Sequence, residues 1–132
     1  MPEENCIFCQ IIAEKEPAVF HYKSKEFVVF ENNLRWFPVQ LLVVPTKHMM
    51  QNDLWSNSEL VSNLCTMANK IGQTHCPDGY RILSNFGAHG MQSQPHAHIH
   101  LIGGEELGLY VKGRPPFFLN NQTSPDGGNK KA

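Results

Sequence analysis

The alternation of apolar and polar residues in the first third of the chain predicts a short helix followed by three strands. Apolar residues after Asn5 recur at helical spacing, and we expect Asn5 to cap a helix that the next proline ends. Two β-like runs, 19–22 and 27–31, flank the polar segment Lys-Ser-Lys-Glu, which is typical of a hairpin. The continuous apolar run 39–44, closed by a proline, predicts a buried third strand.

The rest of the chain predicts one long helix and two further strands. The Ser-Asn-Ser-Glu segment 56–59 has a capping-box pattern, and apolar residues follow it at helical spacing over 60–71. Strands are expected at 80–84 and 97–102, separated by a glycine-containing loop over 85–95. Because the strands are not regularly interleaved with helices, we predict an α+β fold with a mostly antiparallel sheet and helices on one face.

Length and composition predict a single domain that handles a small ligand. The chain has 132 residues, and we expect a folded domain over 1–119 and a disordered tail over 120–132. A formal net charge of -1 argues against binding of a nucleic acid polymer, but not against binding of one phosphate. No apolar run reaches the ~18 residues of a membrane span, and the acidic N-terminus does not resemble a signal peptide. We therefore expect a cytoplasmic protein that does not bind a membrane.

Three histidines alternate along the last predicted strand, at His96, His98 and His100. Alternate residues of a strand share a face, and the residues between these histidines are apolar and suited to a core. The three rings form a solvated face, a metal site without a neighbouring carboxylate, or a centre for nucleophilic or acid–base chemistry. Imidazole titrates near neutrality and forms covalent intermediates, so we favour the chemical interpretation.

The pair Cys6-x-x-Cys9 has the spacing of metal ligands. Two other interpretations remain open, namely a redox dithiol and two small buried side chains. The redox interpretation is weaker, because such a dithiol follows a strand of a βαβ unit and only five residues precede Cys6. Cys65 and Cys76 have no visible partners, and we expect them to be structural.

Three segments resemble the histidine triad (HIT) family, and specifically its Hint-like branch of purine nucleoside phosphoramidases. They are NCIFCQII at 5–12, LVVPTKH at 42–48 and QSQPHAHIHLIGG at 92–104. The resemblance implies a five-stranded antiparallel sheet with two helices, usually in a homodimer. It also implies an enzyme that hydrolyses or transfers nucleoside monophosphates, with phosphoramidates or related nucleotide conjugates as substrates.

The same resemblance implies roles for individual residues. His98 would be the nucleophile that forms a nucleotidyl-histidine intermediate, and His100 would hold and polarise its surroundings through hydrogen bonds. Asn85, Gln92 and Ser93 match positions that contact the phosphate or the leaving group.

The resemblance further implies a zinc site beside the reacting histidine. In zinc-binding relatives the ligands match four residues of this chain, namely Cys6, Cys9, His48 and His96. Such a site would act structurally, tying the N-terminal helix to the catalytic strand while His98 stays free.

Several positions depart from the family pattern on the nucleoside side. Phe8 and Leu42 keep the apolar character expected of the pocket, but Asn32 stands where the Hint-like branch has a ribose-binding aspartate. Gln40 replaces a further histidine and cannot take up a proton at neutral pH. Two other polar replacements of apolar pocket residues are Glu16 and Asn33. These departures motivate an alternative function: a non-catalytic, zinc-stabilised module that binds a nucleotide or a partner.

Overall fold

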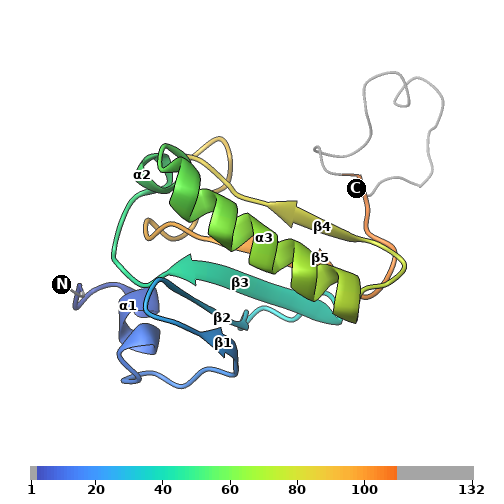
Figure 1. Ribbon diagram of the computed structural model, residues 1–132, viewed down its shortest axis with the longest axis horizontal. Coiled ribbons are helices and arrows are strands. Elements are labelled where there is room, and N and C mark those ends of the chain that lie inside the picture. The colour runs from blue at the N-terminus through green and yellow to red at the C-terminus, as the bar shows by residue number, and fades with distance from the viewer. Residues whose placement is uncertain (1–2, 110–132) are drawn as a thin grey trace.

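The computed structural model describes residues 3–109 and is built around one antiparallel sheet (Figure 1). Its strands lie in the order β1-β2-β3-β5-β4, and each neighbouring pair is antiparallel. The elements in chain order are α1 (Ile7–Ile12), β1 (Phe20–Lys23), β2 (Phe27–Glu31), β3 (Val39–Pro45), α2 (Gln51–Trp55), α3 (Ser58–His75), β4 (Tyr80–Leu83) and β5 (Ile99–Gly103). The predicted α+β class and five-stranded sheet are therefore confirmed.

Each face of the sheet packs against a different helix, so the prediction that the helices lie on one face is wrong. Alternate residues of a strand point to opposite faces, and in β2 both sets are apolar, so each face can bury a helix. On one face, Phe27 and Val29 of β2 pack with the apolar side of α3. On the other face, Val28 and Phe30 pack with α1. Figure 1 shows α3 lying across the sheet, and α1 near the end where β2 begins and β3 ends. The second face is covered over only part of its area, and the histidines lie on that face.

The strand that carries the histidines has the alternation expected from its sequence. Ala97, Ile99 and Leu101 are fully buried in the core under α3. The strand itself begins at Ile99, so the predicted start at residue 97 is wrong. Before Ile99 the chain leaves the ladder with β3, and the N–H of Ala97 donates to the carbonyl of Met49 at 2.8 Å instead.

The helix starts differ from the sequence prediction by one residue each. Cys6, not Asn5, caps α1, and its Sγ accepts a hydrogen bond from the N–H of Cys9. Asn57 caps α3, with its Oδ1 3.0 Å from the N–H of Leu60. Ser56, the first residue of the capping-box pattern, is the C-cap of α2. The short helix α2 was not predicted, since five residues are too few to show a helical period.

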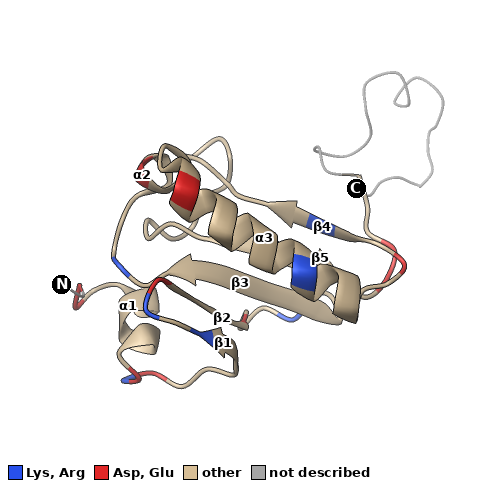
Figure 2. Cartoon of the chain, in the orientation of Figure 1, with Lys and Arg blue, Asp and Glu red and all other residues tan. Residues whose placement is uncertain are grey.

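Charged side chains are dispersed over the fold rather than gathered on one surface (Figure 2). This distribution agrees with the absence of a basic surplus in the sequence. Within residues 3–109, no helix has both the length and the apolar character needed to cross a bilayer. The expected domain end at 119 and the expected tail over 120–132 lie outside the described residues.

Candidate active site and metal cluster

The ring of His98 is held in one tautomer by the backbone next to it. Its Nδ1 lies 2.8 Å from the carbonyl oxygen of His96. A carbonyl can only accept, so Nδ1 carries the proton and Nε2 carries the lone pair. The residue is 2 % exposed, but Nε2 is neither hydrogen-bonded within residues 3–109 nor fully enclosed. Burial lowers the pKa of His98, which keeps the ring neutral and Nε2 available as a nucleophile near pH 7.

His100 lies beside His98, with ring centroids 5.0 Å apart in an edge-to-face arrangement. It lies opposite Leu42 in the pairing of β5 with β3. Its Nε2 is the buried side-chain polar atom that has no hydrogen-bond partner in the described part of the chain. Burial lowers the pKa of His100 to about 4. Buried polar atoms are normally paired, so this nitrogen is left for a group that enters the site.

Gln51, at the start of α2, fixes the backbone of His98 and was missed by the sequence analysis. Its Oε1 accepts from the N–H of His98 at 3.2 Å, and its Nε2 donates to the His98 carbonyl at 3.2 Å. The same Nε2 donates to the carbonyl of Asn85 at 3.0 Å. The hydroxyl of Ser84 donates to the His98 carbonyl as well, at 2.6 Å. Gln51 therefore ties His98 to the segment after β4, and at 3 % exposure it is shielded from competing water.

The loop from Asn85 to Pro95 is folded around the side chain of Gln92. Gln92 Oε1 accepts from the N–H of Gly87 at 2.9 Å, and its Nε2 donates to the carbonyl of Gln94 at 2.9 Å. Gly87 has φ +71, a conformation that glycine adopts readily. Gln92 thus shapes the loop, while the neighbouring Ser93 is exposed. Gln92 and Ser93 both line a cavity of about 660 Å³ between this loop and α2.

Phe8 and Leu42, the apolar residues expected on the nucleoside side, lie in the core between α1 and the sheet. The ring of Phe8 meets the ring of His98 edge to face, with centroids 5.2 Å apart. It meets the ring of His96 in the same way at 5.8 Å. The structure therefore brings Phe8 directly against the triad, and both apolar residues have the burial of ordinary core positions.

Asn32 and Gln40, the two amides that replace expected family residues, both accept hydrogen bonds from nearby backbone N–H groups. Asn32 Oδ1 accepts from the N–H of Leu34 at 2.9 Å, which leaves its amide N–H groups for other partners. Gln40 Oε1 accepts from the N–H groups of Trp36 and Phe37, at 2.9 and 3.2 Å. Gln40 therefore holds the β2–β3 loop. Glu16 and Asn33 are both exposed.

Four side chains form a compact cluster of potential metal ligands beneath α1. They are Cys6, Cys9, His48 and His96, and their ligand atoms all lie within 4.8 Å of one another. The Nδ1 of His96 lies 3.3 Å from Cys6 Sγ and 3.5 Å from Cys9 Sγ, and the Nδ1 of His48 lies 3.4 Å from Cys9 Sγ. Ligand atoms around tetrahedral zinc are about 3.3–3.8 Å apart, so the cluster is close to the required size.

The tautomer of His96 also suits metal binding. Its Nε2 lies 2.8 Å from the carbonyl of Pro45 and must donate to it, which leaves a lone pair on Nδ1 facing the two thiols. Burial lowers the pKa of His96 to about 4, so the ring is neutral. A histidine whose second nitrogen donates to a carbonyl is the usual form of a metal ligand. The four residues can hold a metal ion.

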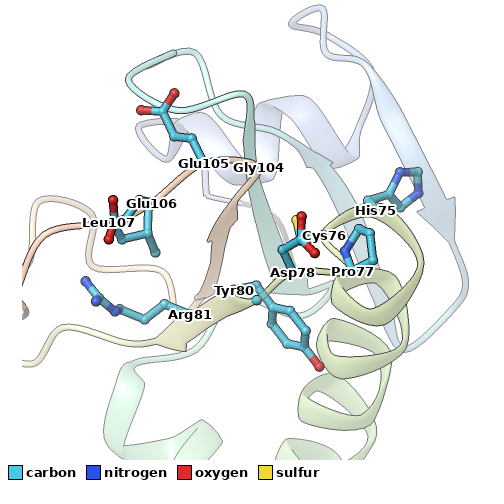
Figure 3. A pocket seen from close by; sticks show the side chains of 11 residues that line it. His75, Cys76, Pro77, Asp78, Tyr80, Arg81, Gly104, Glu105, Glu106 and Leu107 are labelled. Carbon is cyan, nitrogen blue, oxygen red and sulfur yellow. The ribbon is translucent and has the colours of Figure 1, made fainter.

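A second cavity, of about 510 Å³, opens between the C-terminal end of α3 and the segment after β5 (Figure 3). Asp78, Glu105 and Glu106 line it together with Arg81, whose Nη2 donates to the carbonyl of Gly108 at 2.7 Å. The residues predicted for catalysis, nucleotide binding or metal binding do not line this cavity. It is therefore separate from the histidine site. Cys76 is buried at its edge, while Cys65 packs against the core under α3.

Fold and site together define an α+β protein with a buried histidine pair beside a Cys2His2 cluster. A family model described as the HIT domain matches residues 13–107. The chain therefore belongs to the HIT family.

Known relatives are similar over most of their length. The chain is 33% identical over 109 residues to an uncharacterized HIT-like protein of Buchnera aphidicola, which corresponds to 80% of this chain and 96% of the relative. It is 31% identical over 109 residues to the purine nucleoside phosphoramidase of Escherichia coli, or 80% of this chain and 92% of that protein. A histidine triad protein from Clostridium difficile has a similar structure, with a TM-score of 0.76, 30% identity, and coverage of 84% of this chain and 100% of that one.

Proposed function

We propose that the protein is a nucleotide-binding hydrolase or nucleotidyl transferase that acts on nucleoside phosphoramidates or related nucleotide conjugates. The observation that carries this proposal is the tautomer of His98, whose Nδ1–H is held by the His96 carbonyl while Nε2 keeps its lone pair. Membership of the HIT family supports it. So does similarity to the purine nucleoside phosphoramidase of Escherichia coli.

The reaction proceeds in two displacements at phosphorus. The lone pair of His98 Nε2 forms a bond to phosphorus, and the bond from phosphorus to the leaving nitrogen breaks. The electron pair of that bond goes to the leaving nitrogen, which takes a proton from solvent and departs as an amine. The phosphorylated ring is a cation, and the His96 carbonyl on its Nδ1–H stabilises that charge. Water then attacks the same phosphorus, and the bond from phosphorus to Nε2 breaks with its electron pair returning to the ring. The water gives up a proton to solvent, which releases the nucleoside monophosphate and neutral His98.

The phosphate oxygens need donors around the reacting atom, and the 85–95 loop offers them. Ser93 contributes an exposed hydroxyl, and the loop backbone contributes N–H groups held in place by Gln92. Asn85, at the start of this loop, has its carbonyl occupied by Gln51, which leaves its side-chain amide available to a ligand. Half-buried His100 would add a further donor in the tautomer that carries its proton on the unpartnered Nε2.

We further propose that the metal bound by the cysteine–histidine cluster is zinc with a structural role. Two thiols and two imidazoles form a ligand set that zinc prefers. Zinc would hold α1 against the segment that carries His96, and would leave His98 free for the reaction. Metal analysis of protein purified without added metals tests this proposal, and a zinc content near one per chain is the expected result.

A second candidate function is binding without turnover, as a nucleotide-binding or partner-binding module. The local use of Asn32 and Gln40 favours it, because neither amide offers the charge of an aspartate or the proton of a histidine. This candidate predicts nucleotide binding but no phosphorus-linked adduct at His98.

One experiment separates the two functions. Wild-type protein and His98→Ala are incubated with adenosine phosphoramidate and with dinucleoside polyphosphates, and the intact mass is recorded at short times. We expect a nucleotidyl adduct and turnover with wild type only. Nucleotide binding by both proteins, without adduct or turnover, would instead support the binding module.

The chain's resemblance to its family also leads us to propose a homodimer, and its four free cysteines suit the reducing cytoplasm. Light scattering coupled to size-exclusion chromatography tests the homodimer, because it measures the mass of the protein in solution. A mass of one chain in solution would contradict it.

A further inference from the structure

We propose that the cavity between α2 and the loop after β4 binds the leaving group of the nucleotide conjugate, and that this group is uncharged and aromatic. The inference rests on the proposed function. It adds the chemical class of the group that leaves from phosphorus.

Two residues that we propose to act at the phosphate, Gln92 and Ser93, also line the cavity. Ser93 and Gln92 form part of its wall on one side, and Met50 and Asn52 of the α2 region form part of the other. Its volume of about 660 Å³ lies within the ~300–1,000 Å³ of typical small-molecule sites. A conjugate whose phosphate contacts Ser93 therefore extends its leaving group into this space.

The cavity and the nucleophile share one residue. Gln51 lines the cavity, and its side-chain amide bonds both the N–H and the carbonyl of His98. Phe8 and Leu42, assigned to the nucleoside, lie instead under α1 and do not line the cavity. The two halves of a conjugate would thus lie on different elements, with phosphorus between them.

The lining selects for a neutral ligand. Its ten residues carry no formal charge, and they combine the side chains of Met50, Phe86 and Pro95 with the amides of Asn52 and Gln94. An ammonium or carboxylate on the leaving group would lose hydration there without gaining a counterion. Neutral polar atoms would still find donors and acceptors in the amides.

An aromatic pair beside the cavity favours an aromatic ligand in particular, because Phe86 lines the cavity and Trp55 packs against Phe86. The rings of Trp55 and Phe86 meet edge to face with centroids 6.1 Å apart, and they are 40% and 44% exposed. Apolar side chains that stay exposed around a cavity gain free energy when a ligand covers them. An aromatic leaving group is able to continue the edge-to-face arrangement that the two rings already make.

The first test compares adenosine 5′-phosphoramidates that differ only in the amine. The amines are phenethylamine, methylamine and an amine with a carboxylate at the position of the phenyl ring. We expect kcat/KM about tenfold higher for the phenethyl conjugate than for the methyl conjugate, and lowest for the carboxylate. Phe86→Ala should reduce the phenethyl-to-methyl ratio at least threefold. The matched control Tyr22→Ala, a ring of similar exposure on β1, should preserve the ratio.

Equal kcat/KM values for the phenethyl and methyl conjugates, with turnover through His98, would overturn the inference and leave the proposed function standing. A second arm measures binding without turnover. The chain has two tryptophans, so Trp36→Phe makes Trp55 the single emitter, and His98→Ala prevents reaction. The phenethyl conjugate should shift Trp55 emission with at least tenfold higher affinity than the methyl conjugate. Equal affinities and an unchanged spectrum would overturn the inference even if the protein catalyses nothing.

Discussion

The backbone carbonyl of His96 lies 2.8 Å from Nδ1 of His98, while the side chain of His96 belongs to the cysteine–histidine cluster. One residue therefore takes part in two sites. The ring of His96 is held by the Pro45 carbonyl and by the cluster, which fixes the backbone of His96. The carbonyl of that backbone in turn orients the ring of His98. A change in the cluster can therefore alter the orientation of the His98 ring through His96.

Substitution of the nucleophile should abolish the covalent step. We expect His98→Ala to lower kcat by at least about 10³-fold, because no other group can form the intermediate. Quench-flow measurement of the adduct gives the rate directly. A comparable substitution of the exposed His89 should leave the rate unchanged. A His98→Ala protein that still forms the adduct would place the nucleophile elsewhere.

Loss of a metal ligand should weaken the fold before it affects the chemistry. We expect Cys6→Ser to lose bound zinc and to lower Tm by several degrees, since metal-binding free energy contributes to folding. Adding a chelator to wild type should produce the same shift. Cys65→Ser is the control, because Cys65 lies on α3, away from the cluster. Unchanged Tm in Cys6→Ser, together with no bound metal in wild type, would contradict the zinc site.

Stability should decrease as the solution becomes more acidic. Burial lowers the pKa of His96 and of His100 to about 4, below the ordinary histidine value of 6.5. Between pH 6.5 and 4 the unfolded chain binds protons that the folded chain does not, so the free energy of unfolding falls as pH falls. The slope for one histidine is less than about 1.4 kcal/mol per pH unit, because the folded and unfolded chains differ by less than one bound proton at that group.

Urea unfolding across this pH window measures the slope. His100→Gln should make it shallower, because it removes one of the three rings whose pKa is lowered by burial. His75→Gln, at an exposed position in the last turn of α3, should leave the slope as it is in wild type. Equal slopes in all three proteins would show that His100 is not protected from protonation in the folded state.

Gln51 should affect the rate of the chemical step more than substrate binding. Gln51→Leu removes the partner of the His98 N–H and frees the His98 ring segment to move. We expect kcat to fall roughly 10–100-fold with KM changed less than threefold, and stability to fall by about 1–3 kcal/mol. Gln51→Glu keeps the acceptor and should recover part of kcat. Gln73→Leu on the exposed side of α3 is the control.

A purely structural role for Gln51 would give a different result. Tm would fall in Gln51→Leu, but kcat measured well below Tm would equal that of wild type. Single-turnover formation of the His98 adduct at low temperature distinguishes the two outcomes.

Local periodicity predicted the sheet and its core, but not the features that position the site. The alternation of Ala97, Ile99 and Leu101 is a property of neighbouring residues, and it is reproduced as full burial. The contact between Gln51 and His98 joins residues 47 positions apart and leaves no periodic signal. The end of the β5 ladder at Ile99 likewise depends on a hydrogen bond from Ala97 to Met49.

The sequence predicted which residue types form the candidate site, because their chemistry is visible without a structure. The cysteine spacing pointed to two of the clustered side chains, and the alternating histidines pointed to the paired rings, whereas the family resemblance supplied His48 and His96 as the other two members of the cluster. Their burial was not predictable, because it depends on α1 covering the sheet and on Phe8 packing against the rings. A solvated histidine face is therefore excluded for His96 and His98.

Gln40 gives the β2–β3 loop an anchor that is independent of acidity. Its single oxygen accepts from two successive N–H groups, at Trp36 and Phe37. A neutral histidine has one acceptor nitrogen and loses it on protonation, whereas an amide oxygen keeps both lone pairs throughout the physiological pH range. The hydrogen bonds that hold the β2–β3 loop therefore do not change when the histidines of this protein take up protons.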